Sequence, residues 1–218
     1  KFEENIMSLL RQDYPKGRWE VLFIVDNDDS ETEAKVKEIV KKSKSRNARI
    51  IKSVPLLTCS GKNAAMITGV KHAEYDVIAG YDSDARVGRK WLASLVGPLE
   101  DKGIGAATGY RFYLPSKHFV SYILSAWNSI GYVSMKAPYT FVWGGSFAIR
   151  KSFVKKANML AQWAQSVSED TIITSAVKKS KLSIYFVPDA VAISHPSRYS
   201  HITEFTTRQV LMVRWSSS

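Results

Sequence analysis

The stretch "VIAGYDSDARV" (Val77–Val87) joins an apolar run to two aspartates that are one serine apart. The run that ends at Tyr81 has the length and composition of a buried strand, so Asp82 and Asp84 follow directly where the strand is expected to end. The chain as a whole is basic, with 31 Lys and Arg against 20 Asp and Glu and a formal net charge of +11. Because acids are the minority charge, a close pair of them at the end of a strand marks a candidate functional site.

Apolar runs of strand length alternate with helical patterns along the 218 residues. This alternation predicts an α/β domain with a mostly parallel sheet flanked by helices. The expected strands cover residues 19–26, 48–52, 76–82, 103–110 and 141–150, with two short strands around a Pro-Asp turn within 183–194. The expected helices cover residues 30–46, 61–73, 89–100 and 169–179, and Ser30 and Glu33 have the spacing of a capping box.

Composition excludes several classes of protein. The single cysteine, Cys59, excludes an intrachain disulfide and a cysteine-built zinc site. No run of 18 apolar residues is present, so these residues are not expected to cross a bilayer, and the start on Lys1 suggests a piece of a longer protein. The positive charge favours an anionic partner, which could be nucleic acid, an acidic membrane face or a phosphorylated small molecule.

A second group of acids follows an earlier strand. The stretch "VDNDDS" places Asp26, Asp28 and Asp29 after the strand at 19–26. In an open parallel sheet ligands bind beyond the carboxyl ends of the strands, so both groups of aspartates are expected on one rim. Carboxylates gathered there would repel one another unless Mg²⁺ or Mn²⁺ were bound, together with phosphate oxygens. Aspartate is also a common turn former and helix cap, and this interpretation stays open.

A third pair of acids, Glu169 and Asp170 in "QSVSEDTII", opens the helix expected at 169–179. A first-turn acid stabilises the helix dipole, which is one explanation for both residues. An ionised carboxylate near the same rim could also act as the general base for an alcohol nucleophile.

Two other classes of protein remain possible on these residues alone. A phosphohydrolase would use Asp82 as nucleophile and Asp84 as acid, although Arg86 stands where haloacid-dehalogenase-like phosphatases place Thr or Val. A nucleic-acid-binding module would explain the charge, but it gives no reason for carboxylates at two strand ends.

The order of motifs resembles glycosyltransferase families 2 and 21, which have the GT-A (nucleotide-diphospho-sugar transferase) fold, and within them ceramide glucosyltransferases most closely. The motifs are "VDNDDSE", "GKNAAMITGVKHAEYDVIAGYDSDARV", "GGSFAIRKSF", "SED" and "RQVLMVRW". The resemblance implies one catalytic domain over residues 1–218 that lacks the usual first strand and the flanking membrane helices. It also implies a place on the cytoplasmic face of a membrane.

The resemblance assigns roles to residues that match the family motifs. Asp170 matches the base of an inverting transfer, and Asp82 and Asp84 match the motif that holds Mn²⁺ or Mg²⁺ on the donor diphosphate. Contacts to the donor nucleotide are implied for Asp26, Asp28, Asp29, Lys62 and Asp82.

The carboxyl-terminal motif departs from the family pattern. The family has Gln or Arg three residues before its Arg-Trp pair, and here that position is Leu211. Either Arg208 and Gln209 substitute from the preceding turns, or that role is lost. The resemblance implies contacts to diphosphate or acceptor from Glu169, Arg208, Gln209, Arg214 and Trp215. His195 falls where some GT-A enzymes place an extra metal ligand, and a structural histidine is the alternative.

The expected activity is metal-dependent inverting transfer of a hexose from a UDP-sugar, such as UDP-glucose, to a hydroxyl acceptor. The acceptor could be a lipid such as ceramide, or a saccharide if the protein resembles the polysaccharide synthases of family 2; no nucleic-acid partner is expected. The aromatic segment from Pro115 to Pro138 is either a core helix or an amphipathic helix at an anionic membrane surface or over an apolar acceptor.

Overall fold

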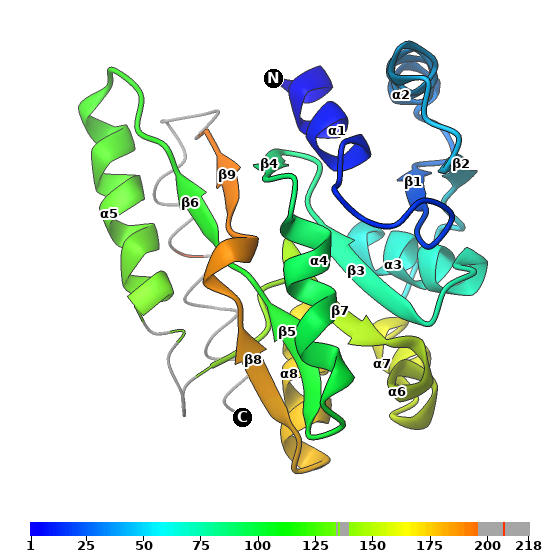
Figure 1. The fold of residues 1–218 in the computed structure, drawn as a ribbon, viewed down its shortest axis with the longest axis vertical. Coiled ribbons are helices and arrows are strands. Elements are labelled where there is room, and N and C mark those ends of the chain that lie inside the picture. Colours follow the sequence, from blue (N-terminus) through cyan, green and yellow to red (C-terminus); the bar gives the residue numbers. More distant parts are fainter. Residues whose placement is uncertain (134, 136–139, 196–206, 208–218) are drawn as a thin grey trace.

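A computed structural model describes residues 1–133, 135, 140–195 and 207. Strands in these ranges form three sheets between layers of helices (Figure 1). The largest has four strands, in the order β3 (Val77–Tyr81), β7 (Ser146–Arg150), β5 (Ile104–Thr108) and β8 (Ser183–Phe186). The other two consist of β1 (Val21–Val25) with β2 (Ala48–Lys52), and of β4 (Ala85–Val87), β9 (Ala192–Ser194) and β6 (Arg111–Tyr113) in that order.

The helices predicted at 30–46, 61–73, 89–100 and 169–179 are confirmed, and the structure adds two short helices within 151–163 that the sequence did not predict. The helices are α1 (Phe2–Leu10), α2 (Ser30–Ser43), α3 (Gly61–His72), α4 (Trp91–Val96), α5 (Phe119–Val133), α6 (Lys151–Lys156), α7 (Met159–Trp163) and α8 (Glu169–Lys179), with short 3₁₀ turns η1 (Gly97–Glu100) and η2 (Pro188–Ala190). Charges at the helix ends suit the helix dipole. In α8, for example, acids occupy the first turn and Lys178 and Lys179 the last.

The predicted α/β class with flanking helices is confirmed, but the two larger sheets are mixed rather than mostly parallel. Pairs β1–β2, β5–β8 and β6–β9 are parallel, whereas β7 runs antiparallel to both of its neighbours, β3 and β5, and β4 runs antiparallel to β9. Between β5 and β7 the chain passes through β6 and α5. It then enters β7 from the end of the sheet at which β5 finished, so β5 and β7 are antiparallel. The expected two strands around a Pro-Asp turn are confirmed as β8 and β9 around η2.

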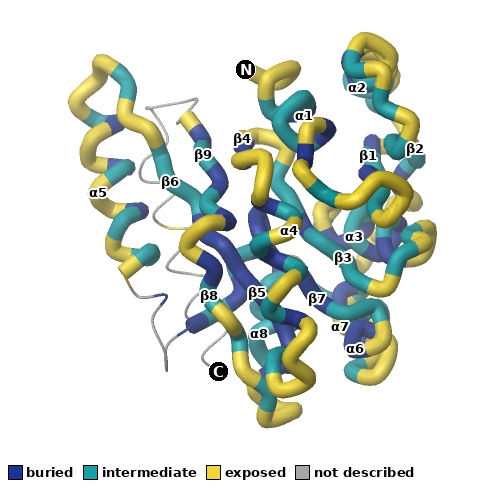
Figure 2. The backbone as a smooth tube through the Cα atoms, viewed as in Figure 1, coloured by how far each residue is buried: buried dark blue, intermediate teal, exposed yellow. Residues whose placement is uncertain are grey.

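Burial is concentrated on β5 and β7, the central strands of the largest sheet (Figure 2). One face packs on α3, α7 and α8, where Phe147, Trp163 and Ile173 are fully buried. The other face packs on α4 through Trp91 and Leu95. The central sheet is therefore a rigid support for the loops at the carboxyl end of β3.

One face of helix α5 is buried against the rest of the protein, and the opposite face is exposed and apolar. Its buried residues are Ser121, Leu124 and Asn128. Six large apolar side chains lie on its exposed face: Phe119, Tyr122, Ile123, Trp127, Ile130 and Val133. Among the residues described, no helix is long and apolar enough to span a membrane.

Candidate active site

The sequence has three acidic motifs, at residues 26–29, 82–84 and 169–170. The second and third line one cavity of about 1960 Å³. Asp82 and Asp84 reach it from the loop after β3, Lys62 from the first turn of α3, and Glu169 and Asp170 from the first turn of α8. The fold therefore brings together residues that are more than a hundred positions apart in the sequence.

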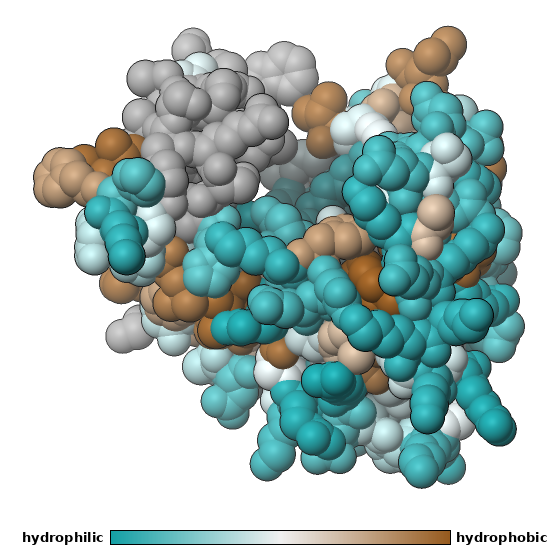
Figure 3. Space-filling view, turned by 90° about the horizontal axis from the view of Figure 1, so that it is seen from above, coloured by the Kyte–Doolittle hydropathy of each residue, from teal (hydrophilic) through white to brown (hydrophobic). Residues whose placement is uncertain are grey.

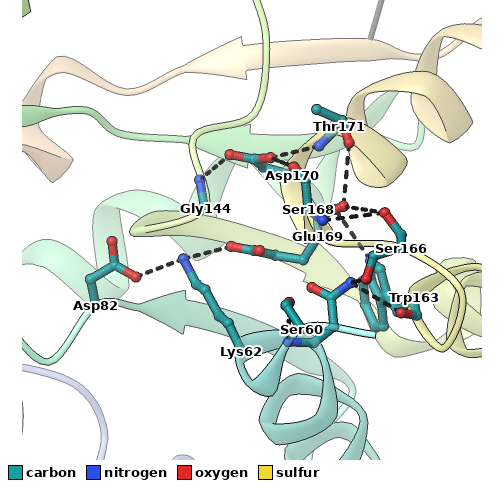
Figure 4. Close-up of polar contacts among 11 residues, drawn as sticks. Ser60, Lys62, Asp82, Gly144, Trp163, Ser166, Ser168, Glu169, Asp170 and Thr171 are labelled. Carbon is teal, nitrogen blue, oxygen red and sulfur yellow. Dashed lines mark hydrogen bonds and ion pairs between the residues drawn. The ribbon is translucent and has the colours of Figure 1, made fainter. Parts of the chain in front are cut away.

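Lys62 joins the two acidic motifs directly. Its ammonium Nζ lies 2.8 Å from Asp82 Oδ1 and 2.6 Å from Glu169 Oε1 (Figure 4). The neighbouring Asn63 is fully buried, and its side-chain amide donates to the carbonyl oxygens of Trp163 at 3.0 Å and Ser166 at 2.8 Å. These bonds fasten the start of α3 to the segment before α8, and they hold Lys62 between the two carboxylates.

The ion pair between Lys62 and Glu169 involves a carboxylate that is almost completely buried. Glu169 is only 3% exposed, and burial raises its pKa above the usual carboxyl range although Lys62 acts in the opposite direction. Burial alone would lower the pKa of Lys62, but the carboxylates of Asp82 and Glu169 outweigh it and raise that pKa. Lys62 is therefore held as a cation that offsets buried negative charge.

Asp170 is oriented by three donors. Its Oδ1 accepts hydrogen bonds from the Thr171 backbone N–H at 2.8 Å and from the Ser168 hydroxyl, and its Oδ2 accepts one from the Gly144 backbone N–H at 3.3 Å. The carboxylate is partly exposed and faces the cavity, so it can accept a proton from a bound hydroxyl group.

The glycine pair in "GGSFAIR", Gly144 and Gly145, lets the backbone pass close to the carboxylates of Glu169 and Asp82. A Cβ on Gly144 would lie 2.0 Å from Glu169 Oε1, and a Cβ on Gly145 would lie 2.4 Å from Asp82 Oδ2. Sequence analysis included the pair in a motif but gave it no role. The structure places it between both acidic motifs, where only glycine fits.

Asp84 is more exposed than Asp82 and has a cationic neighbour. Arg111 Nη1 lies 3.5 Å from Asp84 Oδ2, and its guanidinium lies over the rings of Tyr113 at 4.5 Å and Trp143 at 5.3 Å. Arg111 and Trp143 also line the cavity. Neither was singled out from the sequence, where a lone arginine between aromatics has no distinctive spacing.

His195 lies next to Asp84. The β4–β9 register pairs Ala85 with Ser194, so His195 follows directly beside Asp84, and both line a second cavity of about 240 Å³. In the described part of the chain, no group of three or more His, Cys, Asp or Glu side chains is arranged to hold a metal ion. The role of His195 as an extra metal ligand stays a prediction.

The first acidic motif lies apart from the other two. Asp29 caps α2, because its Oδ1 accepts a hydrogen bond from the Thr32 N–H at 2.9 Å. Hydrogen bonding with the Thr32 side chain, and then with this N–H, lowers the pKa of Asp29. Asp29 therefore takes the capping position expected for Ser30. Asp26 and Asp28 are exposed, and none of these three aspartates lines the large cavity. Their contact with a donor nucleotide stays a prediction.

The two strands before the acidic motifs nevertheless run in the same direction. At their amino ends, the Glu74 N–H donates to Glu20 Oε1 at 2.6 Å, and the Tyr75 hydroxyl donates to the Gly17 carbonyl oxygen at 2.8 Å. Both strands then line the same cavity along their full length. Their acids therefore emerge at the same end of the fold. The remaining predicted site residues, Arg208, Gln209, Arg214 and Trp215, lie outside the described residues.

Residues 1–217 match the model of glycosyl transferase family 21. The chain belongs to this family. A curated relative, the probable glycosyltransferase YdaM of Bacillus subtilis, is 27% identical over 198 residues, which are 86% of this chain and 46% of that protein.

Solved structures place this family 21 domain in the GT-A fold. The mannosyltransferase PcManGT from Pyrobaculum calidifontis, in complex with GDP-Man and Mn²⁺, is 19% identical with a TM-score of 0.64 over 90% of this chain and 54% of that one. Glucosyl-3-phosphoglycerate synthase from Mycobacterium tuberculosis, in complex with Mn²⁺ and UDP-Glc, is 17% identical with a TM-score of 0.58 over 97% of this chain and 73% of that one. The predicted GT-A fold is confirmed, and the chain spans about half the length of YdaM and PcManGT.

Proposed function

We propose that this domain is an inverting hexosyltransferase that moves a sugar from a nucleotide diphosphate to a hydroxyl acceptor. The observation that carries the proposal is the Lys62 bridge, which holds Asp82 and Glu169 together beside Asp170 in one cavity. Membership of family 21 supports the reaction class. A phosphohydrolase is less well supported, because its nucleophile would be Asp82, whose carboxylate is engaged by Lys62.

Asp170 is the proposed base. The backbone N–H groups of Gly144 and Thr171 fix its carboxylate toward the cavity, where it takes the proton of the acceptor hydroxyl as that oxygen attacks the anomeric carbon. Glu169 is almost fully buried against Lys62 and is proposed to position that cation. A contact from Glu169 to the diphosphate or acceptor stays a prediction.

Asp82 and Asp84 are the proposed holders of Mn²⁺ or Mg²⁺. Two carboxylates separated by one residue suit a hard divalent ion that also takes phosphate oxygens, and such sites need no third protein carboxylate. The exposed Asp84 and the partly buried Asp82 both line the cavity, so these residues fit the ion. The bound ion would offset the negative charge that develops on the leaving diphosphate. Arg111, beside Asp84, adds a positive charge from this chain itself.

The donor is proposed to be a UDP-sugar such as UDP-glucose. The structural relatives named above were solved with GDP-Man and with UDP-Glc, so the base of the nucleotide is the feature that needs a direct test.

The acceptor is proposed to be a lipid, such as ceramide, reached from an anionic membrane surface on its cytoplasmic side. The support comes from the exposed face of α5, where Phe119 is 76% and Trp127 is 47% exposed. Figure 3 shows hydrophobic surface at the left edge of the molecule, the side on which Figure 1 places α5. Exposed aromatic and aliphatic side chains on one helix face suit the interfacial region of a bilayer, and a net charge of +11 suits anionic lipids. A saccharide acceptor, as in polysaccharide synthases, is the alternative.

Ligand-induced thermal stabilisation tests the donor and metal together. At a donor concentration about 100 times Kd, binding adds about 2.7 kcal/mol, which raises the Tm of a domain of this size by about 5–10 °C. We expect this rise for UDP-glucose with Mn²⁺ and its loss with a chelator. A rise in Tm for GDP-mannose alone would change the proposed donor nucleotide from uridine to guanosine diphosphate. No rise with any nucleotide sugar would contradict the proposal.

A further inference from the structure

Ser168 stands at the N-cap position of α8, and its hydroxyl is turned to a side chain instead of to the helix backbone. A serine at this position usually accepts a hydrogen bond from the N–H of the second or third helical residue. Among the described residues, Ser168 makes no such capping bond. The N–H of the third helical residue, Thr171, donates to Asp170 Oδ1 at 2.8 Å. The Ser168 hydroxyl is therefore available for another contact.

That contact is with the proposed base. The Ser168 hydroxyl donates a hydrogen bond to Asp170 Oδ1. An ionised carboxylate has no proton to donate, so the hydroxyl must be the donor of this bond. Hydrogen bonds to a charged group are roughly twice as strong as those between neutral groups. The bond therefore contributes more to the position of the Asp170 carboxylate than to the end of the helix.

The backbone of Ser168 is fixed by a hydrogen-bond network that begins on α3. Its N–H donates to Ser166 Oγ at 3.2 Å, and its carbonyl oxygen accepts from the hydroxyls of Ser166 at 3.2 Å and Thr171 at 3.3 Å. The Ser166 carbonyl oxygen in turn accepts from the buried Asn63 amide at 2.8 Å. Ser168 is also only 5% exposed. Its hydroxyl is therefore presented to Asp170 from a buried and well-supported position.

The donors to Asp170 are divided unequally between its two oxygens. Oδ1 accepts from Ser168 and Thr171, whereas Oδ2 accepts from the Gly144 N–H at 3.3 Å. Figure 4 shows Gly144 on one side of the carboxylate and Ser168 and Thr171 on the other. Each carboxylate oxygen has about two lone-pair sites. In the described contacts both sites of Oδ1 are occupied, and Oδ2 keeps one site for a further proton.

We propose that Ser168 is a positioning residue that directs proton transfer to Oδ2 of Asp170, an inference that rests on the proposed role of Asp170 as the base. Because Oδ1 is occupied, the acceptor hydroxyl gives its proton to Oδ2 while its oxygen bonds to the anomeric carbon. The bond from that carbon to the donor diphosphate breaks, and its electron pair leaves with the nucleotide diphosphate. Ser168 itself gives up no proton and touches no reacting atom.

A double-mutant cycle on stability tests the contact without any turnover. The effect of Ser168→Ala on the unfolding equilibrium constant is measured by urea unfolding in the wild type and in Asp170→Asn. The hydroxyl bonds more strongly to a carboxylate than to an amide oxygen, so Ser168→Ala should raise this constant about fivefold more in the wild type. Equal effects in the two backgrounds would overturn the proposal, because a hydroxyl that caps α8 contributes the same with either residue at position 170.

Kinetics tests the positioning role. The probe is UDP-glucose with Mn²⁺, with water in place of the acceptor hydroxyl and UDP release as the readout. Loss of a base costs about 10²–10⁴-fold in kcat, and since two donors still hold the carboxylate, we expect Ser168→Ala to lower kcat by only about tenfold. KM for UDP-glucose should stay within about twofold, because Ser168 makes no contact with the donor in this proposal. Ser168→Thr keeps the hydroxyl and should restore kcat.

Ser43→Ala is the matched control for loss of a serine hydroxyl. Its hydroxyl donates to the Val40 carbonyl oxygen at 2.7 Å in α2, outside the cavity, so turnover should equal that of the wild type.

The outcomes separate this inference from the proposed activity. If Asp170→Asn is inactive while Ser168→Ala turns over like the wild type, the positioning role is wrong and the base assignment stands. A raised KM with unchanged kcat would also overturn the positioning role, because it would place the effect of Ser168 on donor binding. If Asp170→Asn keeps full turnover, the proposed base is wrong and this inference falls with it.

Discussion

The ammonium of Lys62 lies 2.6 Å from the carboxylate of Glu169, and this carboxylate is almost completely buried. The same ammonium lies 2.8 Å from Asp82, which is more exposed. One cation therefore links a buried acid at the start of α8 to the acid that follows β3. The cation stabilises the site electrostatically, and it also fixes the distance between the two acidic motifs.

Replacing Lys62 with Met should destabilise the fold and weaken donor binding. Removing one partner of a fully buried ion pair costs about 3–5 kcal/mol, and because the Lys62 side chain is 46% exposed, we expect a smaller loss of about 1–3 kcal/mol. Urea unfolding gives the free energy of unfolding. The control is Lys35→Met, which removes an exposed i,i+4 pair with Glu31 and should cost much less, because solvent screens the charges of exposed pairs. Equal losses for the two variants would mean that Lys62 is only a surface lysine.

The raised pKa of Glu169 predicts a pH-dependent loss of stability. The folded state binds the proton of Glu169 more tightly than the unfolded state does, so this group makes stability fall as the pH rises from its unfolded pKa of about 4.5 through its higher folded pKa. Glu169→Gln removes this contribution. Between pH 4 and pH 8, the difference in Tm between Glu169→Gln and the wild type should therefore shift in favour of the variant as the pH increases. Parallel curves would contradict the assignment.

Gly144→Ala should damage the site because the new methyl group would overlap the Glu169 carboxylate. Overpacking of this kind typically costs about 1–3 kcal/mol. We expect a lower Tm and weaker donor-induced stabilisation. Gly97→Ala is the matched control: nothing lies within 4 Å of its Cβ position, and its φ of −50° suits alanine. If Gly144→Ala behaves like this control, the close approach of the glycine loop to Glu169 is incorrect.

The sequence was sufficient to predict most elements that carry the site. Periodicity predicts α3, β3 and α8 to within one or two residues, because each has a long apolar pattern with a clear start. It does not give the direction of β7, since a strand that is buried on both faces has the same apolar pattern in either direction. Strands β4 and β6 have only three residues each, too few to show alternation.

Contacts within the site were harder to predict than its elements. The acids at 82 and 169 were both candidates, but their common partner became visible only when Lys62 was placed between them. Asp29 had been given a nucleotide-binding role, and the structure adds a local one, because its side chain caps α2. A short polar side chain can serve either purpose, and sequence spacing alone does not distinguish them.

The exposed face of α5 predicts binding to anionic membranes. We expect the protein to float with vesicles that contain anionic lipid at low salt, and Phe119→Asp with Trp127→Asp to abolish this, because charges at the interface oppose insertion. Leu57→Asp is the control, since that side chain is fully exposed and lies outside α5. Unchanged flotation of the α5 variant, or no flotation of the wild type, would remove α5 as a membrane-binding surface.

Asp170→Asn tests the proposed base. Asparagine keeps the size of the side chain, and its single oxygen can still accept the hydrogen bond from the Thr171 N–H, but its amide nitrogen cannot accept the one from the Gly144 N–H, and the side chain cannot take a proton from the acceptor. The loss of a general base lowers kcat by about 10²–10⁴-fold. Donor-induced stabilisation should be nearly unchanged, because among the described residues Lys62 pairs with Asp82 and Glu169 and not with Asp170. Asp189→Asn, at an exposed turn outside the cavity, controls for loss of an acid. An Asp170→Asn protein with undiminished turnover would assign the proton transfer to another group.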